Sequence, residues 1–497
     1  MPSLNPLDIP EILDCVAQFV SEESRPACSR VSRAWYHAFS PCIWQDIKLD
    51  YDRSDLPKAV HRYSHFIRTL TIDRVPTKEY NALQCSNLRS LKVGDPRKSF
   101  DYSDFITRYP SLTRLSLTGL RSYAPSSSPS IWHKLLAFNN GLTDLTVSHM
   151  VIDEDNVDSF WDLCTRLTRL EFNWISLRHL GNLLWMEFPL LTELQLWSLG
   201  IEEVPICLEL MRGCPNLKAV TWYNWDSRLD AQFLDGFIQL MTENTWPDME
   251  SIFLGTFNTS NEELYWIMRS MRRIKVLNIG GCPDLFRSNS LVQLRPHYRY
   301  LRELNVGSSQ GVTSLMAQEI LCSCPQLLRL SVPLIEARDI VEGQPWVCLG
   351  LKELSACFRF DPLMNETLQP LVLDQLSKLT QLEELSMEWL IRASMFSGSL
   401  YQESFDLRLD NGLAKLSTLR KLRIISFNYI KQRMGQQEMD WILEHWRCLE
   451  ELYGVLNAWS SDKDKVFRER LQRHGIETGP EPSPSEFIGY QTQFIMD

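Results

Sequence analysis

The chain has 497 residues, of which 44% are apolar and 23% are charged, a balance typical of a soluble, folded protein. Its formal net charge of −11 argues against binding to nucleic acids or to anionic membranes, because both partners attract basic surfaces. The sequence contains neither a secretory signal nor an apolar run of about 18 residues, so we expect a cytoplasmic or nuclear protein without a membrane partner.

Residues 1–50 have the pattern of three short helices. In the first, apolar residues recur every three or four positions and form one stripe. The stripe consists of Ile9, Ile12, Leu13, Val16, Phe19 and Val20. A second helix follows Ser24, and a third is predicted from Ser32 to Pro41, because proline interrupts helical hydrogen bonding. Three short helices bury too little apolar surface to be stable alone, so this segment needs a partner, either the next part of the chain or another protein.

A pattern of the form L-x-x-L-x-L recurs across residues 65–456. The copies begin at Ile67, Leu88, Leu112, Leu142, Leu167, Leu191, Leu217, Met249, Ile274, Leu301, Leu327, Leu351, Leu382, Leu419 and Leu449. From 67 to 449 there are 382 residues in 14 steps, so the mean spacing is about 27 residues. The fourth and sixth positions point to one face of a short strand. No such strand can bury that face alone, so the copies are expected to stack into a parallel sheet.

Helices are predicted between these strands, for example at residues 204–213 and 313–323, where the apolar spacing is helical. A proline two residues before the first apolar position ends the helix in several copies. These prolines are Pro110, Pro189, Pro215, Pro247 and Pro325. The repeats resemble those of leucine-rich-repeat proteins, and Cys214-Pro215-Asn216-Leu217 and Cys324-Pro325-Gln326-Leu327 resemble the variant with Cys-Pro-x-Leu before the strand. The resemblance implies an α/β leucine-rich-repeat solenoid, a curved parallel sheet with helices on its convex side.

The N-terminal helices resemble the F-box. The matching segments are Ile9-Pro10-Glu11-Ile12-Leu13, Val31-Ser32-Arg33-Ala34-Trp35 and a closing Trp44. The resemblance implies a substrate-recognition subunit of an SCF-type ubiquitin ligase, in which the F-box docks on a SKP-type adaptor and through it on a cullin–RING ligase. The adaptor-binding residues that it implies are Pro10, Ile12, Leu13, Val16, Val20, Val31 and Trp35.

We therefore divide the chain into an F-box-like helical domain at residues 1–50, a solenoid at residues 51–475 and a flexible C-terminal tail at residues 476–497. An alternative remains open. The chain could be a leucine-rich-repeat interaction scaffold outside any ligase, whose N-terminal helices only cap the solenoid.

The target protein is expected to bind the concave face, which carries the residues between the leucine positions. These include Arg114, Asp144, Arg169, Glu171, Glu193, Gln195, Asn278, Glu303, Asn305, Arg329, Glu353, Glu384 and Lys421. An aromatic row just past the strands, formed by Trp174, Trp197, Tyr223 and Trp225 near Arg169 and Glu193, is typical of a binding hot spot. The alternative is that the charges are solvated and the rings fill space beneath loops.

We expect no catalytic, cofactor-binding or metal site. Gly307-Ser308-Ser309-Gln310-Gly311 matches G-x-S-x-G between a strand and a helix, but a turn of the repeat needs the same residues. The histidines are dispersed and the 13 cysteines lack zinc-ligand spacing. Because no export signal is seen, the cysteines are expected to be reduced and mostly buried. The chain is therefore predicted to recruit its partners without performing chemistry itself.

Overall fold

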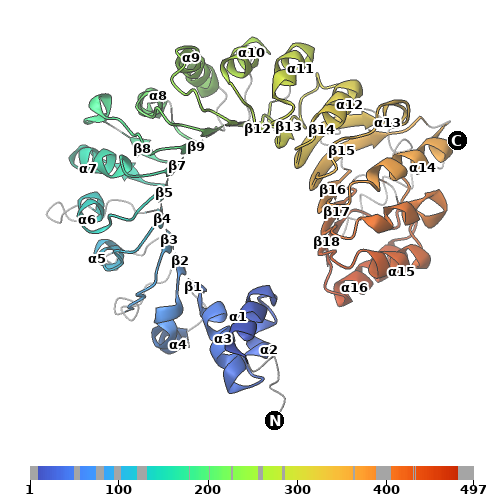
Figure 1. Cartoon of the computed structure of the whole chain (residues 1–497), viewed down its shortest axis with the longest axis horizontal. Coiled ribbons are helices and arrows are strands. Elements are labelled where there is room, and N and C mark those ends of the chain that lie inside the picture. The colour runs from blue at the N-terminus through green and yellow to red at the C-terminus, as the bar shows by residue number, and fades with distance from the viewer. Residues whose placement is uncertain are drawn as a thin grey trace. The chain divides into compact units, whose positions relative to one another are not determined.

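A computed structural model describes residues 9–49, 56–73, 83–94, 102–119, 131–177, 179–200, 202–224, 228–255, 261–282, 286–361, 364–387, 405–428, 430 and 432–479. The chain forms two compact units, Met1–Thr221 (unit 1) and Trp222–Asp497 (unit 2). In each unit, the strands lie side by side along one edge of the repeats and the helices lie on the other side (Figure 1). Within the described residues, no helix combines the length and apolar character needed to cross a bilayer.

Unit 1 begins with the helices α1 (Pro10–Phe19), α2 (Arg25–Cys28) and α3 (Arg33–Trp44). Its main strands are β1 (Asp46–Leu49), β2 (Thr69–Asp73), β3 (Ser90–Gly94), β4 (Arg114–Thr118), β5 (Asp144–Ser148), β7 (Arg169–Asn173) and β9 (Glu193–Trp197). Between them lie α4 (Leu56–Tyr63), η2 (Ser64–Phe66), α5 (Tyr102–Thr107), α6 (Ile131–Phe138), β6 (Val151–Ile152), α7 (Glu154–Cys164), β8 (Ser176–Leu177), η4 (Leu183–Trp185) and α8 (Glu203–Arg212). The strand β10 (Ala219–Tyr223) contains the boundary between the units.

Unit 2 repeats the same alternation. Its strands are β11 (Ser251–Gly255), β12 (Val276–Asn278), β13 (Glu303–Asn305), β14 (Arg329–Glu336), β15 (Glu353–Arg359), β16 (Glu384–Ser386), β17 (Ile424–Ser426), β18 (Glu451–Tyr453) and β19 (Glu477–Thr478). Its helices are α9 (Arg228–Thr242), α10 (Asn261–Ser270), α11 (Ser288–Leu294), η5 (Arg295–His297), α12 (Ser314–Ser323), α13 (Ala337–Glu342), α14 (Asn365–Leu376), η8 (Leu409–Asn411), η9 (Leu413–Thr418), α15 (Gln436–His445) and α16 (Ser461–Arg473).

Buried leucines hold the strands in register. In unit 1, the fourth motif positions pair in order from strand to parallel strand: Leu70, Leu91, Leu115, Leu145, Leu170 and Leu194. All of these side chains are buried between the sheet and the helices. A shift of one residue would turn each leucine to solvent, so burial fixes the register. The fold is a leucine-rich-repeat solenoid. This confirms the α/β class expected from the sequence.

One repeat lies three residues away from its predicted position. The segment from Leu419 to Phe427 contains two overlapping matches to the motif, one beginning at Leu419 and one at Leu422. Pairing with β16 selects the second, because Ile425 lies opposite Leu385 and Ile424 lies opposite Glu384. Lys421 is therefore outside the strand and donates to the Gln381 side chain (2.5 Å), so its predicted place on the strand face is wrong.

The sheet extends slightly beyond both predicted domain boundaries. β1 lies within residues 1–50 but pairs with β2, so it is a strand of the repeat sheet and not part of the helical module. At the other end, the Glu477 amide donates to the Glu450 carbonyl (2.7 Å), and β19 pairs with β18 past the predicted limit at residue 475. The strands β1 and β19 thus each cover the open edge of a terminal motif strand. Residues 480–497 of the predicted tail lie outside the described residues.

A buried ion pair closes the C-terminal end of unit 2. The Arg468 Nε donates to Asp464 (2.7 Å), and both side chains are buried. The other guanidinium nitrogens of Arg468 donate to the carbonyl oxygens of Gly454 (2.6 Å) and Gly479 (2.8 Å). Asp464 also accepts from the Leu456 amide (2.6 Å). Because its hydrogen bonds are made on several sides, this pair ties α16 to the segments after β18 and β19.

Candidate protein-binding surfaces

The N-terminal helices form a small module with a core of its own. The core residues are Leu13, Ala17, Ala38 and Phe39, with Val16, Val20, Cys28, Trp35, Cys42 and Ile43 around them. Ser32 caps α3 by accepting from the Trp35 amide (3.3 Å), and the Trp35 ring stacks on Phe39 at a centroid distance of 5.3 Å. Pro41 does not end α3 as predicted, because Cys42 and Ile43 beyond it still pack against the core.

One side of α3 connects the module to the first repeat. Trp44 stacks on Tyr63 of α4 with ring centroids 4.7 Å apart. The Tyr36 and Tyr63 hydroxyls share a hydrogen bond. These contacts cover the part of the module that faces the solenoid, so the first repeat is one of the partners that the short helices need.

Four large apolar side chains among the described residues of the module are exposed, and they are referred to together as the ridge. They are Ile9, Ile12, Phe19 and Val31. Ile9, Ile12 and Phe19 are spaced for one face of a helix, which differs from the face that buries Leu13 and Ala17. Phe19 is 89% exposed and Val31 is 65% exposed. Exposed apolar surface of this kind typically marks a site for a protein partner.

The structure separates the predicted adaptor-binding residues into three groups. Pro10, Ile12 and Val31 are exposed, and Val16, Val20 and Trp35 are half-buried beside the core. Leu13 is 1% exposed and belongs to the core, so it can support a docked partner only indirectly. Phe19 belongs to the apolar stripe seen in the sequence but is not among the residues that the F-box resemblance implies, and periodicity alone does not rank the residues of one stripe by exposure.

Trp174 is held at the end of β7 by a left-handed turn that recurs in unit 1. Gly119, His149, Trp174 and Ser198 follow successive strands, and each has a positive φ, between 51° and 72°. The Trp174 amide donates to the Trp197 carbonyl (3.0 Å), as the His149 amide does to Asn173 (2.8 Å). A positive φ is costly for residues with a Cβ, and these inter-repeat hydrogen bonds hold the turn.

The predicted aromatic row is only partly present as an exposed surface. Trp174 is 53% exposed and stacks on His149 with centroids 6.1 Å apart, whereas Trp197 is half-buried. Tyr223 is in unit 2, where its ring lies over Gly255 so closely that a Cβ there would clash. Trp225 lies outside the described residues. Of the predicted row, Trp174 is therefore exposed, and its stacking partner is His149.

Arg169 and Glu193, predicted to contact the target, contact each other. The Arg169 guanidinium lies 3.5 Å from Glu193 on the next strand and 3.3 Å from Glu171 on its own strand. Thr146 also donates to Glu171 (3.3 Å). These pairs join neighbouring strands of unit 1, and a target would have to bind over charges that already have partners.

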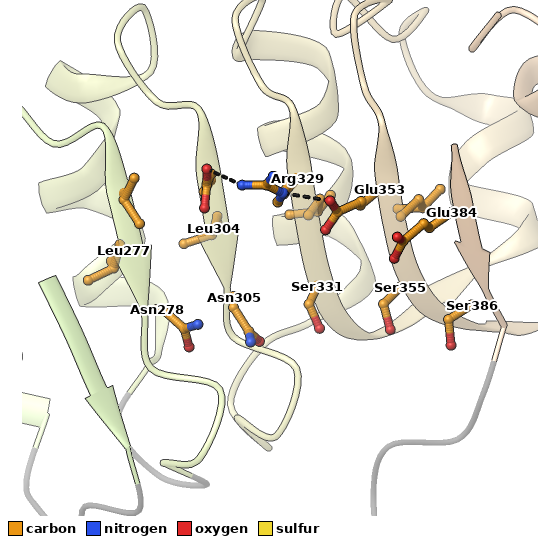
Figure 2. Close-up of a pocket in the computed structure, with 14 residues that line it drawn as sticks. Leu277, Asn278, Leu304, Asn305, Arg329, Ser331, Glu353, Ser355, Glu384 and Ser386 are labelled. Carbon is orange, nitrogen blue, oxygen red and sulfur yellow. Dashed lines mark hydrogen bonds and ion pairs between the residues drawn. The ribbon is translucent and has the colours of Figure 1, made fainter. Parts of the chain in front are cut away.

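In unit 2, two rows of polar side chains cross the sheet face (Figure 2). The first row is Glu303, Arg329, Glu353 and Glu384, which are paired from strand to strand in register. The second row, two residues further along each strand, is Asn278, Asn305, Ser331, Ser355 and Ser386. Both rows point away from the leucines, so the sequence correctly placed Asn278, Glu303, Asn305, Arg329, Glu353 and Glu384 on this face.

The two rows line a hollow with a volume of about 230 Å³ over β12 to β16. Arg329 donates to Glu303 (2.5 Å) and to Glu353 (2.6 Å), which fixes its guanidinium between them. Asn305 accepts from the Gly307 amide (3.1 Å), and a Cβ on Gly280 would lie 2.4 Å from its side-chain oxygen. Glycine at position 280 therefore leaves space for the amide row that forms one wall of the hollow.

Ser309 of the G-x-S-x-G sequence is a turn residue. Its side chain is buried, and its hydroxyl donates to the Cys282 carbonyl of the preceding repeat (3.0 Å). A hydroxyl in this position links two repeats and is not accessible to a substrate. Here the motif forms the strand-to-helix turn of the repeat, as its glycine and serine content also allows.

The cysteines are free thiols, and most of them are buried. Burial raises the pKa of Cys85, Cys324 and Cys348 to about 12, because the thiolate loses its hydration. A thiol with such a high pKa is a poor nucleophile and a poor metal ligand at neutral pH. Within the described part of the chain, no group of three or more His, Cys, Asp or Glu side chains is arranged to hold a metal ion.

No protein-family model matches the sequence, and the comparison with curated proteins found no match. Among solved structures, a chain of the yeast Rad7–Elc1 complex is 13% identical, with 96% of this chain and 98% of that chain covered and a TM-score of 0.43. An internalin (InlF) from Listeria monocytogenes is 12% identical, with coverages of 95% and 94% and a TM-score of 0.29. These similarities are weak, and the fold assigned above rests on the strand register of the chain itself.

Proposed function

We propose that this chain is the substrate-recognition subunit of an SCF-type ubiquitin ligase. The N-terminal module binds a SKP-type adaptor, and the repeats bind a target protein. The F-box resemblance of residues 9–44 supports this function. The observation that carries it is the ridge of Ile9, Ile12, Phe19 and Val31, which stays exposed although the module already packs on the first repeat.

The ridge also favours this function over the alternative of a scaffold with an N-terminal cap. A cap needs only the side that covers the first repeat, and Tyr36 and Trp44 supply that contact through Tyr63. Large apolar side chains on a further side reduce solubility unless a partner covers them. A partner whose groove receives the exposed face of α1 would bury Ile9, Ile12 and Phe19 of this ridge.

In this function, the chain brings its partners together and performs no chemistry itself. The adaptor links it to a cullin–RING ligase, where a charged conjugating enzyme transfers ubiquitin. Binding of the target to the repeats raises the effective concentration of its lysines near that enzyme. Such a receptor needs two binding surfaces and no catalytic group of its own.

The adaptor interface can be tested by co-purification of the full chain with a SKP-type adaptor. We expect the double variant Phe19→Asp, Val31→Asp to lose adaptor capture at least tenfold, because charges would replace exposed apolar contacts. Its melting temperature should remain near that of the wild type, since neither side chain is in the core. Leu13→Asp is a poor test, because it would unfold the module.

Leu315→Asp provides the matched control. Leu315 is 68% exposed, close to the value for Val31, but lies on α12 of unit 2. It should leave adaptor capture unchanged. If the folded double variant still captured the adaptor as well as the control does, the ridge would not be the docking site, and the scaffold alternative would be favoured.

A further inference from the structure

The sheet face over β12 to β16 carries an excess of negative charge. Its lining includes three carboxylates, those of Glu303, Glu353 and Glu384, and one guanidinium, that of Arg329, so its formal charge is −2. Arg329 pairs with Glu303 and Glu353. Among the described residues, no hydrogen bond or ion pair involves the side chain of Glu384, the last carboxylate that lines the hollow (Figure 2). This face can therefore accept one more cation.

The surroundings of Glu384 do not compensate its charge. Burial raises its pKa, and the nearby carboxylates of Glu353 and Glu451 raise it further, while Arg423 and Arg329 act in the opposite direction. Both arginines already have acidic partners, since Arg423 forms a two-pronged pair with Glu450 (2.6 and 3.0 Å). A cation from outside would relieve the repulsion without breaking any of these pairs.

The shape of the face limits what can bind there. At about 230 Å³, the hollow is smaller than pockets for drug-sized ligands, which begin near roughly 300 Å³, so it fits one side chain better than a cofactor. Ile424, half-buried, lies directly opposite Glu384 on the next strand. An acidic group beside an aliphatic side chain suits arginine or lysine, whose apolar stem can lie on the isoleucine while the charged end reaches the carboxylate.

We propose that the β12–β16 face of unit 2 binds an extended segment of the target protein through one basic side chain, with Glu384 as its counter-ion and Ile424 beneath its stem. The row of Asn278, Asn305, Ser331, Ser355 and Ser386 supplies uncharged hydrogen-bonding groups for the peptide backbone beside it. This inference rests on one part of the proposed function, the binding of a protein target by the repeats. It adds that the bound segment of the target carries a basic side chain.

The test compares three pools of fluorescein-labelled decapeptides that are random except for one central residue. That residue is arginine in the first pool, citrulline, its uncharged analogue of equal shape, in the second, and glutamate in the third. Fluorescence polarisation with the full chain should show roughly tenfold tighter binding of the arginine pool than of the citrulline pool at low salt. Glu384→Gln should bring the ratio close to one, and Glu384→Arg should create a preference for the pool with central glutamate.

Glu342→Gln on α13 is the control for net charge, because it removes one carboxylate from an exposed helical pair with Arg338 (2.8 Å). It should keep the arginine preference. The inference is overturned if the wild type binds the arginine and citrulline pools equally, if Glu384→Gln keeps the preference, or if Glu342→Gln loses it to the same extent. Adaptor capture by the same preparations reports on the ligase function separately, since Glu384 is in unit 2 and the ridge is in unit 1.

Discussion

His297, in η5 of unit 2, is a buried histidine whose ionisation opposes folding. Burial lowers the pKa of its imidazole, and a hydrogen bond to the Met268 carbonyl offsets this only in part. In the unfolded chain a histidine titrates near pH 6.5. Just below that pH the unfolded chain binds more protons than the folded one, so acidification lowers the free energy of unfolding.

We therefore predict that His297→Gln reduces the pH dependence of stability. Between pH 7.5 and pH 5.5 the melting temperature of the wild type should fall more than that of the variant, because glutamine takes up no proton. The measurement is differential scanning fluorimetry across this range. His37→Gln, at an exposed position of α3, should follow the wild type. If the melting temperature of His297→Gln falls between pH 7.5 and pH 5.5 as much as that of the wild type, other groups set the pH dependence of stability.

Exposure at single positions is also what divides the N-terminal stripe into a core side and an exposed side. Leu13 and Phe19 belong to the same apolar pattern, yet one is buried and the other is 89% exposed. The sequence predicted the stripe and the docking module, but it could not rank the members of the stripe. That ranking depends on where α3 packs, because α3 covers only one side of α1.

At the scale of elements, the turn between a strand and the next helix is where repeats are joined. The Ser309 hydroxyl, after β13, donates to the carbonyl of Cys282, after β12. Asn278 and Asn305 accept from the Gly280 and Gly307 amides at the same place in their repeats. Such bonds satisfy polar groups that the turn would otherwise bury without partners.

Ser309→Ala tests this reading of the G-x-S-x-G sequence. We expect a loss of about 1–3 kcal/mol in the free energy of unfolding, because a buried hydrogen bond is removed. Ser308→Ala, at the neighbouring half-buried position, should change stability by less than about 0.5 kcal/mol. Urea titration followed by circular dichroism measures both. Equal stability of the two variants would contradict a structural role for Ser309.

The choice of register is likewise made by the neighbouring element. Leu419 and Leu422 both begin acceptable motifs, and composition does not distinguish them. The strand β17 forms at Ile424–Ser426 because that alignment places Ile425 against Leu385 and the core. The same choice brings Ile424 beside Glu384, so the proposed site for a basic side chain could not be found from the predicted register.

At the scale of the whole molecule, a solenoid is held together by contacts between neighbouring repeats, and its ends need protection. In unit 2 the end is closed by Arg468, which bonds to Asp464 and to the Gly454 and Gly479 carbonyls. A buried charge that loses its partner is strongly destabilising. Loss of this ion pair should therefore destabilise the last repeat most and the repeats before it progressively less.

We predict that Arg468→Ala lowers the free energy of unfolding by about 3–5 kcal/mol. Hydrogen–deuterium exchange should rise most in β18 and β19, less in β14, and not in β2 to β5 of unit 1, because coupling runs from repeat to repeat. Arg473→Ala, which removes an exposed pair with Glu469, is the control and should change neither quantity. If hydrogen–deuterium exchange in Arg468→Ala rose equally along the whole chain, this local coupling would be contradicted.

The sequence by itself determined the repeated strand, the α/β solenoid and the apolar N-terminal stripe, because each follows from periodicity, and periodicity is a local property of the chain. Tertiary structure decided which face of α1 is covered, which leucine begins the repeat at β17, and which charges on the sheet already have partners. Arg169 and Glu193 pair with each other, whereas Glu384 has no such partner among the described residues. These outcomes depend on contacts between residues far apart in the chain, and a pattern along one strand does not contain them.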